Sequence, residues 1–108
     1  MSIGLLLEYT VPTKKSGFVP IATEEAFHTY WQPGCAALHL QWVPLFQTGL
    51  PLQQEEISLI IEELVLLKQW LSGQIETGVP QVVVVRIEQL IQALQKVQGD
   101  SQVTMYIG

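Results

Sequence analysis

Few side chains in this sequence are spaced so that they could do chemistry together. His28 follows Glu24 by four residues, a spacing that places two side chains on one face of a helix. A metal site needs a third or fourth donor, and the surrounding sequence supplies none. We interpret Glu24 and His28 as a surface pair and predict no metal site.

Cys35 and His39 are also four residues apart, which raises the possibility of a thiol nucleophile with its base. Such a pair needs a third group to orient the base, and the sequence shows neither that group nor a loop to stabilise an oxyanion. We predict a packed, unreactive Cys35 thiol and a half-exposed His39. A hydrolase-like or ligand-binding domain that uses His28, Cys35 and His39 is the least favoured alternative.

Acidic pairs occur at Glu24-Glu25, Glu55-Glu56 and Glu62-Glu63. Neighbouring residues on a helix point about 100° apart, so each pair fits a first-turn charge or a solvated flank better than an acid and base sharing one substrate. The eight glycines are scattered, and no glycine-rich phosphate loop is present. We expect neither an enzyme nor a bound cofactor.

Composition limits the class of protein and its partners. With 108 residues, 48% of them apolar and 14% charged, the chain fits a single globular domain over residues 1–108. Its net charge of −5 repels nucleic acid and anionic lipid, so we expect a protein partner, and a basic one, with no nucleic acid and no membrane.

The single cysteine, Cys35, has no partner for an internal disulfide. The first residues, MSIGLLLEY, lack the basic and long apolar regions of a secretory signal. No apolar run approaches the roughly 20 residues that cross a bilayer. We therefore expect a cytoplasmic protein.

The first third of the chain predicts a strand, a loop and a short helix. Ile3–Thr10 is rich in apolar residues and predicts a strand, and the breaks at Pro12, residues 14–17 and Pro20 predict a loop after it. A helix is predicted over Glu24–Trp31, with Thr23 as its N-cap, and it is expected to end at Pro33-Gly34.

Residues 35–43 fit a period of two and a helical period equally well, so periodicity does not decide between strand and helix. Because Pro44 disfavours a helix that runs through it, we expect irregular or strand-like chain before Pro44 and a helical turn up to Gly49.

The second half of the chain predicts two long helices and a strand. One helix covers Gln53–Ser72 and ends at Gly73 in a left-handed conformation. The other covers Pro80–Gln98, with Pro80 in its first turn, although the valines within residues 81–85 would also suit a buried strand. The apolar spacing of three and four that favours the helix involves Val83, Ile87, Leu90, Ile91, Leu94 and Val97.

A closing strand over Gln102–Ile107 is expected to pair with Ile3–Thr10. The predicted fold class is α+β: a small sheet that includes the N- and C-terminal strands, covered by two amphipathic helices.

The helix over Gln53–Ser72 carries more apolar residues than one face can hold. Projected at about 100° per residue, one stripe forms a core face and a narrower stripe with acidic neighbours lies roughly opposite. Packing inside the chain and recognition of a partner both remain open for the second stripe. The core face consists of Ile57, Ile60, Ile61, Leu64, Lys68 and Leu71. The predicted partner-binding residues are Glu55, Leu59, Glu62, Glu63, Leu66 and Trp70.

The order of these segments resembles one group of immunity proteins from bacterial polymorphic-toxin systems. The segments that carry the likeness are SIGLLLEYTVP, FHTYW, WVPLFQTGLPLQQEEISLIIEELVLLKQWL, VRIEQLIQAL and VTMYIG. The resemblance implies a small, non-enzymatic protein that neutralises a cognate toxin by binding it. No toxin-contact motif transfers residue by residue.

The charge, the missing catalytic residues and the second stripe predict a protein-binding domain, and the resemblance implies an immunity protein as its most specific form. The alternative is a structural or regulatory homo-oligomer that uses the second stripe of the Gln53–Ser72 helix as its self-interface.

Overall fold

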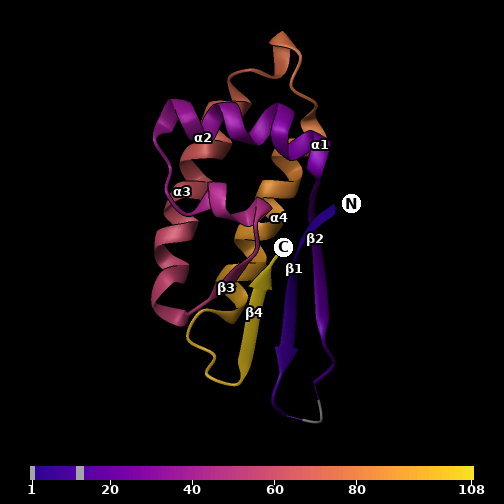
Figure 1. Cartoon of the computed structure of the whole chain (residues 1–108), viewed down its shortest axis with the longest axis vertical. Coiled ribbons are helices and arrows are strands. Elements are labelled where there is room, and N and C mark those ends of the chain that lie inside the picture. The colour runs from indigo at the N-terminus through magenta and orange to yellow at the C-terminus, as the bar shows by residue number, and fades with distance from the viewer. Residues whose placement is uncertain (1, 12–13) are drawn as a thin grey trace.

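The computed structural model describes residues 2–11 and 14–108, and the strand break predicted at Pro12 lies outside them. One antiparallel sheet has the strand order β2-β1-β4-β3 (Figure 1). The predicted α+β class is confirmed, as is the pairing of the N-terminal strand with the C-terminal one. The strands are β1 (Ser2–Tyr9), β2 (Gly17–Thr23), β3 (Leu50–Leu52) and β4 (Val103–Ile107).

Both edge strands of the sheet contain a proline, Pro20 in β2 and Pro51 in β3. The sequence predicts no strand at either place, and that prediction is wrong. A proline has no N–H to donate, but an edge strand tolerates it because one side of the strand has no partner. The pairing of β1 with β2 also shifts register between Ile3 and Gly4, as at a β-bulge. Prolines at both edges disfavour the addition of further strands.

The helical segment after β2 continues well beyond the predicted end at Pro33-Gly34. The N–H of Gln32 donates to the carbonyl of Phe27, five residues back, so the chain makes a π turn just before Pro33. A proline inside a regular helix loses a hydrogen bond and crowds the carbonyl four residues earlier, whereas here Pro33 lies in the first turn of a new α-helix. The successive segments are α1 (Glu24–Ala26), the π-helix η1 (Phe27–Trp31) and α2 (Gln32–Leu38).

The two ends of this helical segment have clear causes. The predicted N-cap is confirmed, because the Thr23 hydroxyl accepts a hydrogen bond from the N–H of Ala26 at 3.0 Å. At the other end His39 takes a left-handed conformation, φ 56°. Residues 35–38 belong to α2, and residues 39–42 are irregular. The irregular chain expected before Pro44 is thus present over residues 39–42, whereas the strand-like alternative is wrong. The helical turn expected before Gly49 is present as the 3₁₀ helix η2 (Val43–Gln47).

The two long helices are α3 (Gln54–Ser72) and α4 (Gln81–Val97), joined through the short 3₁₀ helix η3 (Ile75–Thr77). The predicted left-handed end at Gly73 is wrong: its φ is −70°, and Gly78 takes the positive φ instead, at 123°. The undecided residues 81–85 belong to α4. Pro80 precedes that helix in an extended conformation, one residue before its predicted place in the first turn.

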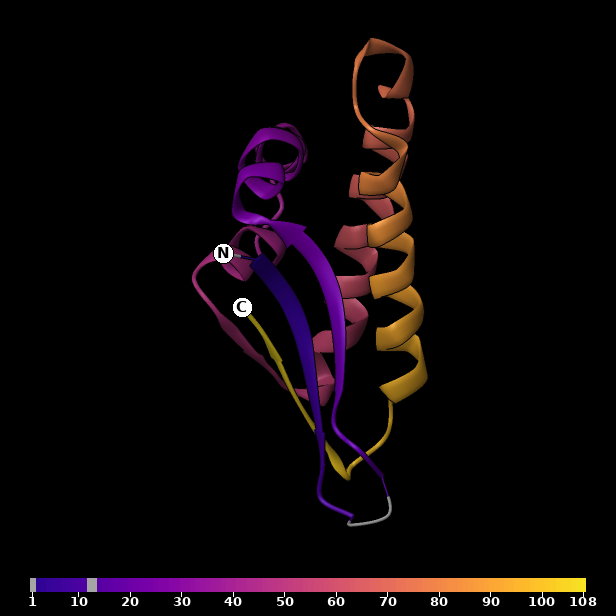
Figure 2. The same cartoon turned by 90° about the vertical axis from the view of Figure 1, so that its right-hand side faces the viewer.

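The molecule has two layers that are displaced along its longest dimension. The hairpin of α3 and α4 forms one layer (Figure 2). The second layer consists of the sheet, which faces one part of this hairpin, and of α1 and α2, which cross over the other part (Figure 1). The longest extent of the molecule is 46 Å, whereas a helix of 19 residues spans only about 28 Å. The molecule is longer than its hairpin because the sheet reaches beyond one end of α3 and α4 (Figure 2). The sheet therefore does not cover the whole hairpin, and α1 and α2 cover the rest.

Three aromatic rings fill the space where the sheet meets the crossing helices α1 and α2. Phe27 stacks on Trp31 with ring centroids 5.3 Å apart, and Phe46 lies 6.5 Å and 6.4 Å from these two rings. All three side chains are fully buried. Phe27 and Trp31 come from η1 and Phe46 from η2, so the cluster joins the crossing helices to the chain that leads into β3.

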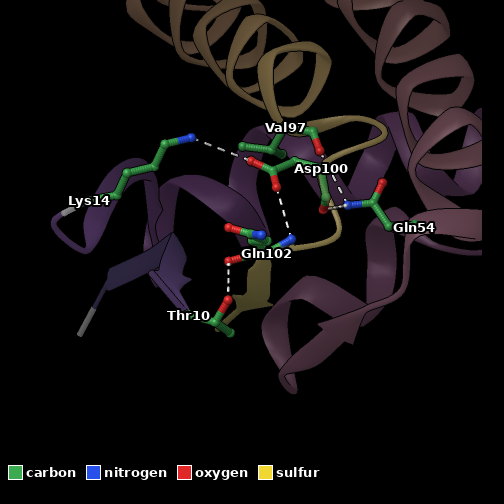
Figure 3. Close-up of polar contacts among 6 residues, drawn as sticks. All are labelled: Thr10, Lys14, Gln54, Val97, Asp100 and Gln102. Atoms are coloured by element: carbon green, nitrogen blue, oxygen red, sulfur yellow. Dashed lines mark hydrogen bonds and ion pairs between the residues drawn. The ribbon is translucent and has the colours of Figure 1, made fainter. Parts of the chain in front are cut away.

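The loop between α4 and β4 is fixed by side chains from two distant segments (Figure 3). The Gln54 amide nitrogen donates to the carbonyls of Val97 at 3.2 Å and Asp100 at 2.7 Å. The Thr10 hydroxyl donates to the carbonyl of Gln102 at 3.2 Å, and Lys14 lies 3.8 Å from the Asp100 carboxylate. These contacts hold the loop where β4 enters the sheet beside β1.

Gly34 allows α2 to approach α3 closely. A Cβ atom at Gly34 would lie 2.5 Å from Leu67 Cδ1 and 2.9 Å from Trp70 Cε3. A glycine usually weakens a helix, by about 1 kcal/mol relative to alanine. Here the missing side chain is what makes room for Leu67 and Trp70.

We predict that Gly34→Ala lowers the free energy of unfolding by about 1 to 3 kcal/mol, because the added methyl overpacks the contact with α3. Gly73→Ala is the matched control: its φ is −70° and a Cβ would meet only ordinary contacts, the nearest at 3.6 Å. The control should be neutral or stabilising by about 0.4 to 1 kcal/mol. Urea denaturation of the two variants measures the difference, and equal stability would contradict the proposed close approach.

Candidate protein-binding surface

A line of alternating acidic and apolar side chains runs along the solvent side of α3. Glu55, Leu59, Glu62 and Leu66 follow one another at spacings of four, three and four, which keeps them on one face of a helix. We call these four residues the acidic ridge. Both glutamates are exposed, and Leu59 and Leu66 remain 46% and 48% exposed. Four of the six predicted partner-binding residues therefore lie together on one exposed surface.

The other two predicted residues, Glu63 and Trp70, lie on the flank of α3 that faces α2 and η2. Trp70 is partly buried against the core and lies beside Gly34. A projection of the helix places both residues near the ridge. It gives the direction of each side chain around the helix axis, but it does not show that α2 and η2 pack against that flank. In the fold they belong to the contact between α3 and the crossing helices.

The Glu63 carboxylate caps the start of η2. It accepts three backbone N–H bonds, from Gln41 at 3.0 Å, Trp42 at 2.9 Å and Val43 at 3.0 Å. The first N–H groups of a helix have no partner within the helix, and a carboxylate there satisfies them with charge-assisted bonds. The charge of Glu63 is therefore used inside the chain.

The core face of α3 agrees with the projection, with one addition. Ile57, Ile60, Leu64 and Leu71 are fully buried as predicted. Leu67 is also fully buried, although it lies outside the predicted core face, because α2 packs against this side of α3 at Gly34. The remaining two predicted residues, Ile61 and Lys68, are only partly buried, and Lys68 lies 3.8 Å from Glu88 of α4.

Cys35 is buried on α2, as predicted, and its environment disfavours the thiolate. Burial, together with the negative charge of Glu63, raises the pKa of the Cys35 thiol from 9.0 to about 12. His39 is exposed, as are Glu24 and His28. Within residues 2–11 and 14–108, no group of three or more His, Cys, Asp or Glu side chains could hold a metal ion.

The structure also places an apolar row on the outer face of the sheet, which the sequence analysis missed. Leu6 of β1 is directly paired with Phe18 of β2 and with Tyr106 of β4. These side chains are 37%, 58% and 45% exposed, respectively. The available signal was the run Leu5-Leu6-Leu7: consecutive residues of a strand point to opposite faces, so the run gives both faces of the sheet apolar side chains.

No protein-family model matches this chain, and neither a curated protein nor a solved structure matches it significantly. No helix in the described part of the chain is long and apolar enough to cross a membrane.

We predict that Glu63→Gln destabilises the fold by about 2 kcal/mol, because an amide offers one acceptor oxygen where a carboxylate satisfies three N–H groups. The adjacent variant Glu62→Gln is the control, since the Glu62 side chain is exposed on the acidic ridge. It should change stability by no more than about 0.5 kcal/mol. Thermal and urea denaturation separate the two variants. Equal effects would mean that Glu63 does not act as a cap.

We predict that native Cys35 is alkylated at neutral pH at least tenfold more slowly than the same thiol after unfolding, because the thiolate is the reactive form. The measurement is the labelling rate with a thiol reagent, with and without denaturant. Labelling of the folded protein as fast as that of the unfolded protein would contradict this prediction.

The same pKa shift has a consequence for stability. The unfolded thiol loses its proton first, so the contribution of Cys35 to the free energy of unfolding is full below pH 9.0 and declines as the pH rises from 9.0 to about 12. Cys35→Ala provides the control, because it lacks this contribution and its stability should decline less over the same range.

Proposed function

We propose that this protein is a non-enzymatic protein-binding domain that binds a basic protein through the acidic ridge of α3. The observation that carries the proposal is the pair of half-exposed leucines, Leu59 and Leu66, alternating with the exposed carboxylates of Glu55 and Glu62. Interfaces commonly combine apolar anchors with surrounding polar groups, and charged residues speed the capture of a partner of opposite sign.

Charge supports a basic partner over a second copy of the chain. The whole chain carries a net charge of −5, so two copies repel each other before contact. Pairing two ridges also brings glutamates of both copies into one interface, where like charges are costly. A basic surface with apolar pockets meets the same ridge without either penalty.

The most specific form of this proposal is an immunity protein that neutralises a bacterial toxin by binding it. The segment order described above suggests this class, and an acidic ridge suits a toxin domain that is basic because it acts on nucleic acid. The proposal places the protein in the cytoplasm, where the single buried thiol of Cys35 remains reduced.

The test is affinity capture from the native host with mass identification, or from cells expressing a neighbouring toxin-like reading frame. We predict that the double variant Leu59→Ser/Leu66→Ser loses at least tenfold in affinity for the captured basic protein, with little effect on folding. Charge reversal at Glu55 and Glu62 should slow association and weaken its salt dependence.

Two control variants separate this surface from the rest of the molecule. Leu6→Ser/Tyr106→Ser alters exposed apolar residues of the outer sheet face and should leave capture unchanged. Trp70→Ala should lower the free energy of unfolding, by about 2 kcal/mol or more, because Trp70 packs inside the chain. Capture that is unaffected by the ridge double variant would contradict the proposal. An oligomeric wild type, together with a monomeric Leu59→Ser/Leu66→Ser variant, would favour the homo-oligomer instead.

A further inference from the structure

A cavity opens where the upper end of the sheet meets α1 and the first turns of α4. Its volume is about 290 Å³. Most of its lining is apolar and comes from three different parts of the fold: Ile3 and Ile21 of the sheet, Trp31 of the aromatic cluster, and Val83 of α4. These side chains belong to the buried core, so the walls are held by the same packing that forms the fold.

Among the residues that the structure describes, Arg86 is the one with a cationic side chain that lines this cavity. It is also the only arginine in the sequence, which has ten acidic residues and five basic ones. No carboxylate among the described residues lies within salt-bridge distance of its guanidinium, whereas Lys14 and Lys68 are paired with Asp100 and Glu88.

The guanidinium is held in place but keeps most of its donors free. One of its nitrogens donates to the carbonyl of Pro20 at 3.4 Å, and Arg86 is partly buried. A guanidinium has five N–H donors, arranged so that two of them can bind both oxygens of one carboxylate. Arg86 can therefore bind a carboxylate without giving up an existing ion pair.

We propose that this cavity binds a small amphipathic carboxylate, with its apolar body against the exposed Val82 and the edges of Ile3 and Val83, and its carboxylate on Arg86. At roughly 30 Å³ for each water-sized group, the volume accommodates about ten non-hydrogen atoms. This size fits a medium-chain fatty acid or an arylalkanoic acid. Small-molecule sites typically combine such an apolar lining with a few placed polar groups.

This site is independent of the acidic ridge, because the ridge faces solvent on α3 and none of its residues lines the cavity. The two proposals can therefore fail separately. The charges also differ: the ridge attracts cations, whereas Arg86 selects an anion in a chain that otherwise repels anions. An anionic ligand that binds here must have apolar contacts strong enough to offset that repulsion.

The experiment titrates ¹⁵N-labelled protein with octanoate, 1-octanol and octylammonium, which share an apolar chain and differ in charge. We expect saturable shift changes at residues lining the cavity, with octanoate binding at least tenfold more tightly than 1-octanol and octylammonium binding most weakly. Arg86→Gln should remove the preference for octanoate. Lys96→Gln, which removes an exposed cation from the last turn of the same helix, should keep it.

Ala26→Leu provides a second variant, since Ala26 lines the cavity and leucine fills space there while preserving helix propensity. It should weaken octanoate and 1-octanol alike. The proposal is overturned if octanoate and 1-octanol bind equally, if Arg86→Gln binds octanoate as tightly as the wild type, or if no saturable binding occurs at millimolar concentrations. Shift changes confined to the outer sheet face, around Phe18 and Tyr106, would also overturn it.

Discussion

The displacement of the two layers along the long axis is the constraint from which most of this structure follows. Because the sheet faces only part of the α3–α4 hairpin, the rest of that apolar surface needs another cover, and α1 with α2 supplies it (Figure 2). The close contact at Gly34 and the aromatic cluster around Trp31 both serve this second contact. So does the Glu63 carboxylate, which satisfies the start of η2 beside α3. Loss of any of these contacts would uncover apolar surface on the hairpin.

The same arrangement decides which groups are left for function. Glu63 and Trp70 take part in the contacts of α3 with η2 and α2, while Leu59 and Leu66 stay half-exposed. The seam between the sheet and the crossing helices leaves the cavity beside Arg86. The uncovered outer face of the sheet carries Leu6 and its two aromatic neighbours. Each candidate surface is thus a place where one layer ends or has no partner.

Cys35 illustrates how packing overrides residue type. A cysteine four residues from a histidine can suggest a catalytic thiol, but activation requires a lowered thiol pKa. Here burial and the charge of Glu63 both raise the pKa of Cys35. The carboxylate itself is engaged by three backbone N–H groups. The contact that brings Glu63 near Cys35 is therefore structural, and it opposes nucleophilic chemistry at that thiol.

Local pattern was sufficient for the long helical periods and for the Thr23 cap, but not for the end of α3 at Gly73. The helical spacing of α4, the core positions Ile57, Ile60, Leu64 and Leu71, the Thr23 cap and the pairing of the terminal strands could all be predicted from the sequence, since each depends on neighbouring residues or on an end-to-end apolar pattern. The edge strands around Pro20 and Pro51 could not, because an edge position that tolerates proline exists only once the sheet has formed. For the same reason, projection of α3 alone did not separate Glu63 and Trp70 from Leu59 and Leu66. The sequence determined that α3 has two apolar sides, and the tertiary structure decided that α2 and η2 cover one flank and leave the ridge exposed.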